Sequence, residues 1–484
     1  MLRVAFQSFL GKTPHWYKLT VIAFLLINPV VFFFISPFLA GWLLLLEFIF
    51  VLAMALQCYP VPSGGLLAIE AIMIGLTTPA GVYQEVSGNL PIILLLIFMV
   101  TGIYYIKDVL FLCFTKLFIA IRSKALLSFM FCLISATLSS FLDALTLMAV
   151  IVAVCFNLYA IYHRVSSSMA KPGAIDEEMV QFKGFLRNIV MHGAVGTALG
   201  GTMTMVGEPQ NLMIATKMDW SFAEFFLRCS VISLPVAAVG LITCPILEMI
   251  KFPGFGYQLP QKARDAILKD YREKYGRISK QNAYLYLTQL AVGVLLFAAL
   301  ALHVAEIGLI GIGLIVVLTA LRGLTHEHNF AEAFNNAMPF VTLIMVFFAI
   351  LAVVHDQHLV TPLIEMVFEF KEEQQLIALY LVNGVLSLIS DNVFIASVFI
   401  NELEKAFAQG MFSREWYDKL AVIVNMGTNI PAVATPNGQA AFLFLLTSSL
   451  APVIRLSYLE MVKLALPYTI ILTLAGGVCV YLFL

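Results

Sequence analysis

Two aspartates in long apolar stretches are the residues whose surroundings point most directly to chemistry. Asp143 is the only charged residue between positions 125 and 162, and Asp391 is the only one between positions 376 and 400. A serine stands four positions before each of them, Ser139 before Asp143 and Ser387 before Asp391. In a hydrocarbon layer a carboxylate is expensive unless it faces protein, water or an ion. The recurrence of this arrangement therefore indicates two functional carboxylates.

Two further polar segments interrupt apolar runs. Positions 200–211 read GGTMTMVGEPQN, and positions 429–439 read NIPAVATPNGQ. Their glycines and prolines break helices, and unwound backbone at membrane depth is tolerated only where it is buried in protein or lines an aqueous cavity. One such break can be no more than a kink, and a buried Ser or Thr usually bonds to its own helix. Two breaks at matching positions of the chain favour a functional role.

These four interruptions supply a consistent set of ligands. Carbonyl, hydroxyl, amide and carboxylate oxygens suit a small alkali cation rather than a transition metal. We therefore expect the interruptions to converge on a site for a small alkali cation, and we expect no cofactor. The candidate residues are the polar side chains of the four segments: Asp143, Asp391, Ser139, Ser140, Ser390, Asn392, Thr202, Asn211, Thr428, Asn429, Thr435 and Asn437. Glu208, in the Gly-Glu-Pro sequence of the first break, is a secondary candidate.

The composition is that of a membrane protein. Of the 484 residues, 61% are hydrophobic and only 12% are charged, and the mean hydropathy is +0.94. A soluble protein has too few polar residues here to cover its apolar surface. The net charge of −1 gives no indication of nucleic acid binding. The seven cysteines lie in or beside apolar runs without a CxxC motif, so we expect packing residues rather than disulfides or a zinc site.

The order of the elements predicts an all-α fold of two inverted repeats, with about 11 spans plus two re-entrant hairpins. The extra first span lies in residues 1–37. The first repeat covers 38–250, with a hairpin at 125–162 and a broken helix at 189–216. A cytoplasmic linker with a helical portion follows at 251–283. The second repeat covers 284–484, with a hairpin at 374–401 and a broken helix at 420–447. Residues 79–89 are expected to be a loop. Inverted repeats with broken helices are typical of secondary transporters.

The distribution of basic residues gives the orientation. With both hairpins returning to their own side, the inside segments hold 22 of the 28 Lys and Arg residues and the outside segments hold six. The positive-inside rule then places the N-terminus in the cytoplasm and the C-terminus outside. Counting either hairpin as a single crossing would spoil this segregation.

The segments GGTMTMVGEPQN and VATPNGQAAF, with the two Ser/Asp hairpin tips, resemble the ion-transporter superfamily of dicarboxylate/sodium symporters, arsenite pumps and sodium/proton antiporters. The resemblance covers essentially the whole chain and is strongest to NhaB-type bacterial sodium/proton antiporters. It implies a homodimer in the bacterial inner membrane, in which a scaffold domain carries a mobile domain made of hairpins and broken helices. It also implies exchange of cytoplasmic Na+, or Li+, for external H+.

Other classes of protein share some of these features. A Na+-coupled anion or dicarboxylate symporter has the same fold, but the symporter branch carries Ser-Asn-Thr at the hairpin tips. Here the tips read Leu-Asp-Ala around Asp143 and Ser-Asp-Asn around Asp391, and added carboxylates would repel a dianion. An intramembrane aspartyl protease, the enzymatic alternative, would need a GxGD motif that neither aspartate has. A passive channel would not need inverted repeats.

Four other polar residues in or beside apolar runs have simpler interpretations. Glu47 and Glu70 lack broken-helix neighbours, which favours a structural or interface role. His355 lies with His358 at the end of an apolar run, where an exposed surface histidine is the simpler interpretation and pH sensing the alternative.

The orientation can be tested by labelling single cysteines in intact cells and in inverted vesicles. A cysteine replacing Lys269, in the linker, should react only from the cytoplasmic side. A cysteine replacing Gln409, after the second hairpin, should react only from outside. Reaction of both cysteines from the same side would show that one hairpin has been miscounted.

Overall fold

The computed structural model describes residues 2–169, 177–275, 279–302 and 304–484, and within these ranges the chain is helical and has no β-strand. Residues 170–176 and part of the predicted linker, 276–278, lie outside the described residues. The elements up to the linker are α1 (Leu2–Ser8), α2 (His15–Phe34), α3 (Pro37–Ala53), α4 (Pro60–Ile74), α5 (Pro79–Gly88), α6 (Leu90–Leu94), the π-helix η1 (Leu95–Met99), α7 (Val100–Tyr104), α8 (Lys107–Ala120), α9 (Lys124–Ser139), α10 (Ala144–Met169), α11 (Glu177–Gly201), α12 (Pro209–Met218) and α13 (Phe222–Met249).

The second part of the chain begins with the helix of the linker. Its elements are α14 (Gln261–Tyr275), α15 (Lys280–Ala301), α16 (Ile307–Arg322), α17 (Glu327–Asp356), α18 (Thr361–Phe368), α19 (Glu372–Ile389), α20 (Asn392–Ala408), α21 (Arg414–Asn429), the 3-10 helix η2 (Pro431–Ala434), α22 (Ala440–Thr447), α23 (Leu450–Val453) and α24 (Tyr458–Phe483). Helix α14 confirms the helical portion expected in the linker.

Six helices among the described residues are long and apolar enough to cross a membrane, or seven if α5 and the following α6–α7 helix form one bent span. Five shorter apolar helices of 10–17 residues accompany them. The prediction of an all-helical polytopic membrane protein is confirmed. The count of about 11 spans, which needs the shorter helices, stays a prediction.

The expectation of a loop at 79–89 is wrong. The Thr78 hydroxyl accepts a hydrogen bond from the Gly81 amide at 3.0 Å, and Pro79 occupies the first helical position. Both features start helices, because the cap satisfies a free N–H group and proline has none to lose. The resulting α5 meets the next helix at an angle of 63°.

Each predicted interruption coincides with an end of a helix. The predicted first hairpin corresponds to α9 and α10, which are separated at 140–143, and the predicted second hairpin corresponds to α19 and α20, which are separated at 390–391. The first broken helix is interrupted between α11 and α12, and the second between α21 and α22. Proline stands at the first or second position of α12 and of η2. The local signals of Asp, Gly and Pro therefore located the breaks.

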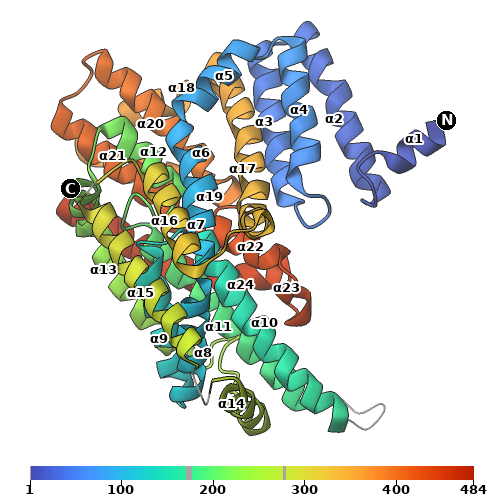
Figure 1. Cartoon of the computed structure of the whole chain (residues 1–484). Helices are drawn as coiled ribbons and strands as arrows, with labels where there is room; N and C mark the ends of the chain where they lie inside the picture. Colours follow the sequence, from blue (N-terminus) through green and yellow to red (C-terminus); the bar gives the residue numbers. More distant parts are fainter. Residues whose placement is uncertain (1, 170–176, 276–278, 303) are drawn as a thin grey trace.

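Figure 1 shows the arrangement of these elements. Helices α2, α3 and α4 stand together at one side, and α14 lies at the bottom beside the end of α10. Helix α9 packs chiefly on α11, α19 on α21, and α13 on α24, whereas α17 packs on α4, α5 and α7 and also touches α20. The hairpin arms thus lie directly on the broken helices.

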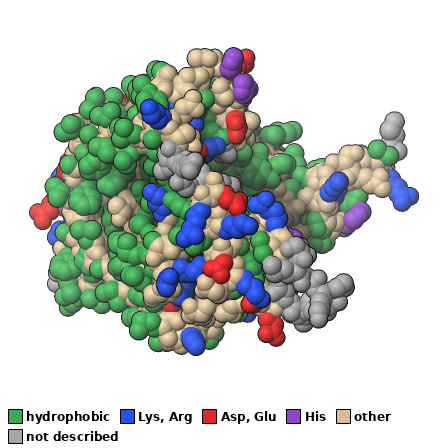
Figure 2. Space-filling view, turned by 60° about the horizontal axis from the view of Figure 1, so that its bottom comes forward, with side chains coloured by type: hydrophobic (Ala, Val, Ile, Leu, Met, Phe, Trp, Pro, Cys, Tyr) green, Lys and Arg blue, Asp and Glu red, His purple; other side chains and the backbone are tan. Residues whose placement is uncertain are grey.

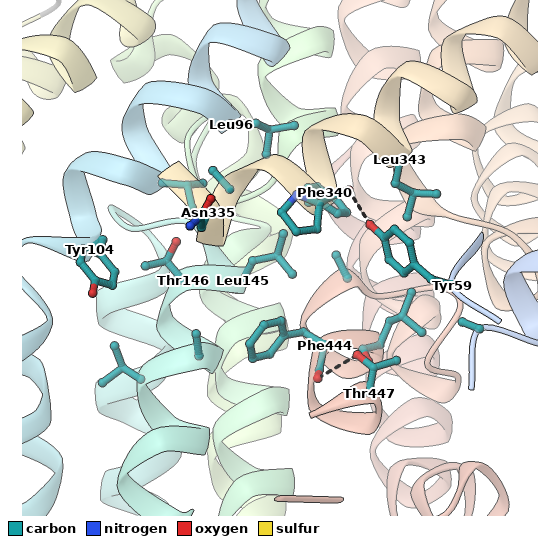
Figure 3. Close-up of a pocket in the computed structure, with 18 of the residues that line it drawn as sticks. Tyr59, Leu96, Tyr104, Leu145, Thr146, Asn335, Phe340, Leu343, Phe444 and Thr447 are labelled. Atoms are coloured by element: carbon teal, nitrogen blue, oxygen red, sulfur yellow. Dashed lines mark hydrogen bonds between the residues drawn. The ribbon is translucent and has the colours of Figure 1, made fainter. Parts of the chain in front are cut away.

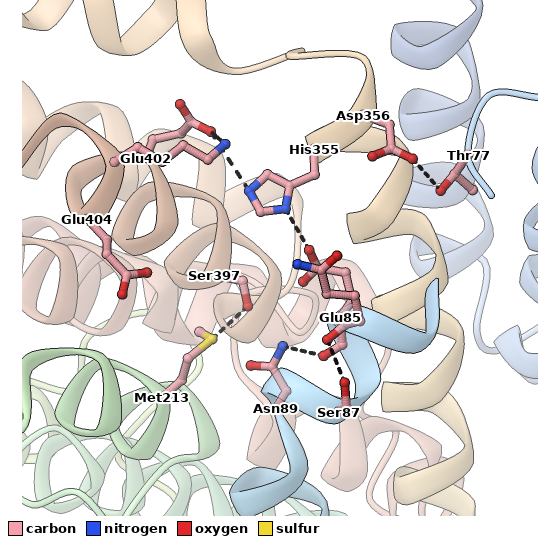
Figure 4. Close-up of polar contacts among 12 residues, drawn as sticks. Thr77, Glu85, Ser87, Asn89, Met213, His355, Asp356, Ser397, Glu402 and Glu404 are labelled. Carbon is pink, nitrogen blue, oxygen red and sulfur yellow. Dashed lines mark hydrogen bonds and ion pairs between the residues drawn. The ribbon is translucent and has the colours of Figure 1, made fainter. Parts of the chain in front are cut away.

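Helix α17 ends among polar contacts that join three elements (Figure 4). His355 Nδ1 lies 2.6 Å from Glu85 Oε1 of α5, and its Nε2 lies 3.9 Å from Glu402 Oε1 of α20. The neighbouring Asp356 accepts a hydrogen bond of 2.8 Å from the Thr77 hydroxyl. His355 is therefore only partly exposed and is engaged with two carboxylates, contrary to the expectation of an exposed surface histidine.

Backbone contacts join the helices at the breaks. A Cβ atom added at Gly200 of α11 would lie 1.9 Å from the Ala136 carbonyl oxygen of α9, and one added at Gly196 would lie 2.4 Å from the Cys132 carbonyl oxygen. In the second half, a Cβ at Gly427 of α21 would lie 2.9 Å from the Tyr380 carbonyl oxygen of α19. Small residues that let helices approach this closely drive helix association in membranes, where apolar burial supplies little.

A buried ionic cluster ties α9, α11, α13 and α24 together at one end. Glu248 Oε1 lies 3.2 Å from Lys124 Nζ and 2.7 Å from His192 Nε2. The other ring nitrogen of His192 lies 2.7 Å from the Tyr468 hydroxyl. Because a buried charge is costly unless it is paired, this cluster favours one arrangement of the four helices. No local pattern in the sequence points to this cluster, because its members lie far apart in the chain.

The contact of α9 with α11 predicts the effect of adding one methyl group. Gly200→Ala should lower the free energy of unfolding by about 1–3 kcal/mol, because the two backbones must move apart. The measurement is the midpoint of thermal unfolding in detergent. Gly293→Ala is the matched control, since a Cβ at that position of α15 meets nothing within 4 Å. Equal midpoints for the two variants would contradict the packing described.

Candidate functional site

Three buried carboxylates gather where the interruptions meet. The residues Asp143, Glu208 and Asp391 are 1%, 2% and 8% exposed. Both hairpin aspartates lie close enough to Glu208 for their charges to act on it. Within the described ranges, none of the three carboxylates forms a salt bridge. A proton or a bound cation is the natural way to neutralise such a group.

The two hairpin aspartates each cap the second helix of their hairpin. Asp143 Oδ2 accepts hydrogen bonds of 3.0 Å from the amide and from the hydroxyl of Thr146. Asp391 Oδ1 accepts from the amides of Val393 at 2.8 Å and Phe394 at 3.4 Å. Carboxylates are stabilised at helix N-termini by such N–H groups and by the helix dipole. Capping explains part of their position, but Asp143 Oδ1 is left buried without a partner among the described residues.

Glu208 is held against the backbone of the first break. A Cβ at Gly201 would lie 3.0 Å from Glu208 Oε1, and a Cβ at Gly207 would lie 2.5 Å from the Gly201 carbonyl oxygen. The two glycines therefore let the chain fold back on itself and place the Glu208 side chain over the end of α11. Glu208 Oε1 is buried and has no hydrogen-bond partner in the described part of the chain.

The tip of the first hairpin is bonded to the first break. The Ser140 hydroxyl lies 3.1 Å from the Gly200 carbonyl oxygen, and the Thr204 hydroxyl donates to the Ser140 carbonyl oxygen. Asn211 Nδ2 donates to the carbonyl oxygens of Gly201 and Thr204, at 2.7 Å each. Carbonyls freed by the break are thus partly satisfied by side chains, as membrane depth requires.

The tip of the second hairpin is bonded to the second break in a related way. The Thr435 hydroxyl donates to the Leu388 carbonyl oxygen at 2.6 Å. Asn437 Nδ2 lies 3.5 Å from the Ile389 carbonyl oxygen. The Gly438 amide donates to the Thr435 hydroxyl oxygen at 3.2 Å. Each hairpin tip therefore rests on the broken helix of its own half.

Hydrogen bonds also join the two breaks to each other. Asn429 Nδ2 lies 3.2 Å from Asn211 Oδ1, and Gln210 Nε2 donates to Asn429 Oδ1 at 2.9 Å. Gln439 Nε2 donates to the Asn429 carbonyl oxygen at 3.2 Å, and Asn425 Nδ2 donates to the Thr202 carbonyl oxygen at 3.2 Å. The structure thus brings residues from positions 200–211 and 425–439 into one network.

The remaining candidate residues either bond to their own helix or have no partner among the described residues. The hydroxyls of Thr202 and Thr428 donate to the carbonyl oxygens four positions earlier in their own helices, which is the usual behaviour of a buried threonine. Ser139 Oγ and the amide of Asn392 are buried without a partner among the described residues. Ser390 is buried at the tip beside Asp391.

A cavity of about 670 Å³ reaches this region (Figure 3). Asp391, Asn437 and Thr146 contribute to its wall, so it touches both hairpins. Most of its other lining is apolar, including Leu145, Phe340 and Phe444. Asp143 does not line the cavity. Thr146, whose hydroxyl donates a hydrogen bond to Asp143, does line it. The cavity therefore reaches residues at the tips of both predicted hairpins.

Several residues of this region were missed in the sequence. Gln210 and Gln439 lie inside the two polar breaks but do not differ in pattern from their neighbours. Thr146 follows Asp143 by three positions, and this spacing of a capping aspartate is a signal that could have found it. Outside the site, Asn28 Nδ2 donates to Glu47 Oε2 at 2.7 Å and to Glu70 Oε2 at 2.9 Å. This contact between α2, α3 and α4 agrees with the structural role expected for both glutamates.

The helical fold and the three buried carboxylates, Asp143, Glu208 and Asp391, together define an integral membrane protein. These carboxylates, called the acidic centre below, are suited to a proton or a small cation. Comparison of the sequence with known families makes this specific. The family model for the bacterial Na+/H+ antiporter B (NhaB) matches residues 1–484, and the chain belongs to this family.

Individual relatives are similar over nearly their whole length. The Na(+)/H(+) antiporter NhaB of Citrobacter koseri is 52% identical over 488 residues, covering 99% of this chain and 95% of that protein. The Na(+)/H(+) antiporter NhaB of Pectobacterium atrosepticum is 52% identical over 491 residues, covering 99% and 93%. The corresponding protein of Salmonella newport is 51% identical over 488 residues, covering 99% and 95%.

Proposed function

We propose that this protein exchanges Na+, or Li+, for H+ across the bacterial inner membrane, with Asp143, Asp391 and Glu208 as the carriers of charge. Membership of the antiporter family and the names of its relatives support the exchange itself. The observation that carries the assignment of the site is the group of three buried carboxylates without a salt bridge among the described residues.

Carboxylates meet the main requirement of antiport, which is that the two ions compete. An ionised carboxylate binds Na+, and protonation of the same oxygen removes that ligand. If Na+ and H+ bound to separate groups, both could bind at once and cross together. The oxygens of Asp143 and Glu208 that have no described partner are available for either ion.

The symporter alternative receives no support from the comparisons, whose printed names are those of antiporters. The acidic centre argues against it on physical grounds too. Three carboxylates would repel a dicarboxylate, and no salt bridge in the described part of the chain neutralises them. Transport chemistry, rather than catalysis of a reaction, is consistent with all of these findings.

The proposal includes the two inverted repeats, 38–250 and 284–484, and a cytoplasmic N-terminus with a periplasmic C-terminus. The matching order of hairpin and broken helix supports the repeats. The orientation is supported by Figure 2, in which Lys and Arg side chains gather on the face around the bottom of the molecule. Helix α14 of the proposed cytoplasmic linker lies at that end.

The proposal also includes a homodimer in which each protomer divides into a scaffold and a mobile part. The mobile part consists of the hairpins, the broken helices and the helices packed on them, and it moves past α3–α7 and α15–α17. Its internal hydrogen bonds and close backbone contacts support movement as one body. Alternating access then follows from displacement of this body, as in other transporters built from inverted repeats.

Replacement of the hairpin aspartates tests the assignment. Asp143→Asn and Asp391→Asn should each nearly abolish Na+-driven proton movement in proteoliposomes, because an amide keeps the size of the side chain but cannot exchange a proton. In the unmodified protein, the apparent Na+ affinity should fall about tenfold for each pH unit below the range in which one competing proton binds.

Glu47→Gln and Glu70→Gln are the matched controls and should leave substantial exchange, since both glutamates contact Asn28 away from the breaks. Transport is normalised to the amount of protein inserted. Unimpaired antiport by the Asp143→Asn, Asp391→Asn double variant would refute the assignment and leave Glu208 as the next carboxylate to test.

Crosslinking tests the movement. In a transport-competent protein without its seven native cysteines, a short cleavable crosslinker between His355→Cys of α17 and Glu402→Cys of α20 should stop exchange while Na+ binding persists. The two side chains lie across the proposed boundary, with His355 Nε2 3.9 Å from Glu402 Oε1. Cleavage of the crosslinker should restore exchange.

The control pair joins two elements of the proposed mobile part. Lys217 of α12 and Glu404 of α20 form a salt bridge of 2.7 Å, so a crosslink between cysteines at these positions should leave exchange intact. Full activity of the completely crosslinked His355→Cys, Glu402→Cys protein would rule out movement at this boundary.

A further inference from the structure

Two buried glutamines from opposite halves of the chain are hydrogen-bonded to one residue, Asn429. Gln210 is 1% exposed and Gln439 is 0% exposed. Gln210 donates through Nε2 to Asn429 Oδ1 at 2.9 Å, and Gln439 donates through Nε2 to the Asn429 carbonyl oxygen at 3.2 Å. The Oε1 atom of each glutamine is buried and has no hydrogen-bond partner among the described residues.

The orientation of both amides follows from these contacts. Each Nε2 faces an oxygen acceptor, so exchanging N and O within either amide would place two oxygens against each other. The oxygens without a partner are therefore the amide oxygens. Buried polar atoms in proteins nearly always have a partner, and an exception needs an explanation. Two of the buried oxygens without a described partner thus belong to side chains that are hydrogen-bonded to the same residue, Asn429.

The groups around the two glutamine oxygens indicate that a cation is their missing partner. Gln210 is the second residue of α12, two positions after Glu208, and Gln439 directly precedes α22. Glu208 Oε1 and Asp143 Oδ1 likewise lack a partner in the described part of the chain. Amide and carboxylate oxygens together are the hard ligands that alkali cations prefer.

We propose that Gln210 Oε1 and Gln439 Oε1 are neutral ligands for a partly dehydrated Na+ or Li+, one from each half, and that Asn429 positions them. This inference rests on the proposed exchange of Na+ for H+ and assigns a separate task within the same site. An amide oxygen binds a metal ion but takes up no proton at physiological pH. The glutamines therefore add affinity for the metal ion without adding competition by protons, whereas the carboxylates provide both.

Separate effects on affinity and pH dependence test this division. Gln210→Met and Gln439→Met keep the length of the side chain but remove the amide oxygen. Each should raise the apparent KM for Na+ and for Li+ roughly tenfold, the usual effect of losing one good polar contact. The pH dependence of transport should keep its position and slope. The same loss of affinity should appear in the stabilisation of purified protein by Na+ against thermal unfolding, which requires no transport.

Gln289→Met is the matched control. Gln289 is also fully buried, but both ends of its amide are bonded, to the Val109 amide and to Asp108. Its replacement should lower thermal stability without changing the apparent KM for Na+. If the Gln210 and Gln439 variants behave like this control, their role is structural and the proposal is wrong.

Gln210→Glu and Gln439→Glu give a second test if the methionine variants do not fold. These variants keep an oxygen and the size of the side chain but add a group that can bind a proton. Na+ should still bind at high pH, and its affinity should fall more steeply on acidification than in the unmodified protein. An unchanged pH dependence would overturn the proposal. Failure of the unmodified protein to couple Na+ to proton movement would instead overturn the proposed function, while the binding measurement still tests the ligands.

Discussion

The close approach of α9 to α11 is the contact on which the rest of the site depends. With no side chain at Gly196 or Gly200, the backbones of the two helices touch over one turn. This contact brings the Ser140 hydroxyl to the Gly200 carbonyl oxygen and Thr204 to the Ser140 carbonyl oxygen. In lipid, helices gain little from burying apolar side chains against each other. Backbone contact and hydrogen bonds must therefore supply the specificity, and both are concentrated here.

The centre combines two kinds of polar group that respond differently to the low dielectric around them. Carbonyl groups freed by the breaks accept hydrogen bonds from Asn211, Thr435 and other side chains, so part of the hydrogen-bonding capacity of the unwound backbone is satisfied within the protein. The carboxylates of Asp143 and Glu208 are only partly satisfied, and they lie near each other. Hydrogen-bonded polar groups thus surround a small number of carboxylate oxygens that have no partner among the described residues.

Local signals explain how much of this could be predicted. The breaks at Asp143, Asp391 and Pro209 follow from residue types that end or cap helices, and the structure has helix ends at all three. Thr78 before Pro79 is the same kind of signal. Because it was overlooked, helix α5 was not predicted. The bonds of Asn429 to Gln210 and of Glu248 to His192 link positions 219 and 56 residues apart. Such pairs depend on packing of whole helices, which no local pattern reveals.

The cavity beside Asp391 has a consequence that concerns water rather than ions. Its volume of about 670 Å³ can hold about 20 water molecules at ~30 Å³ each. Because most of its wall is apolar, this water is weakly held, and narrowing such a space favours dewetting. Any movement that closes the cavity must release this water to the surrounding solution. If the displacement proposed for the mobile part closes the cavity, solutes too large to enter favour that arrangement and couple the shape of the protein to the osmotic pressure of its surroundings.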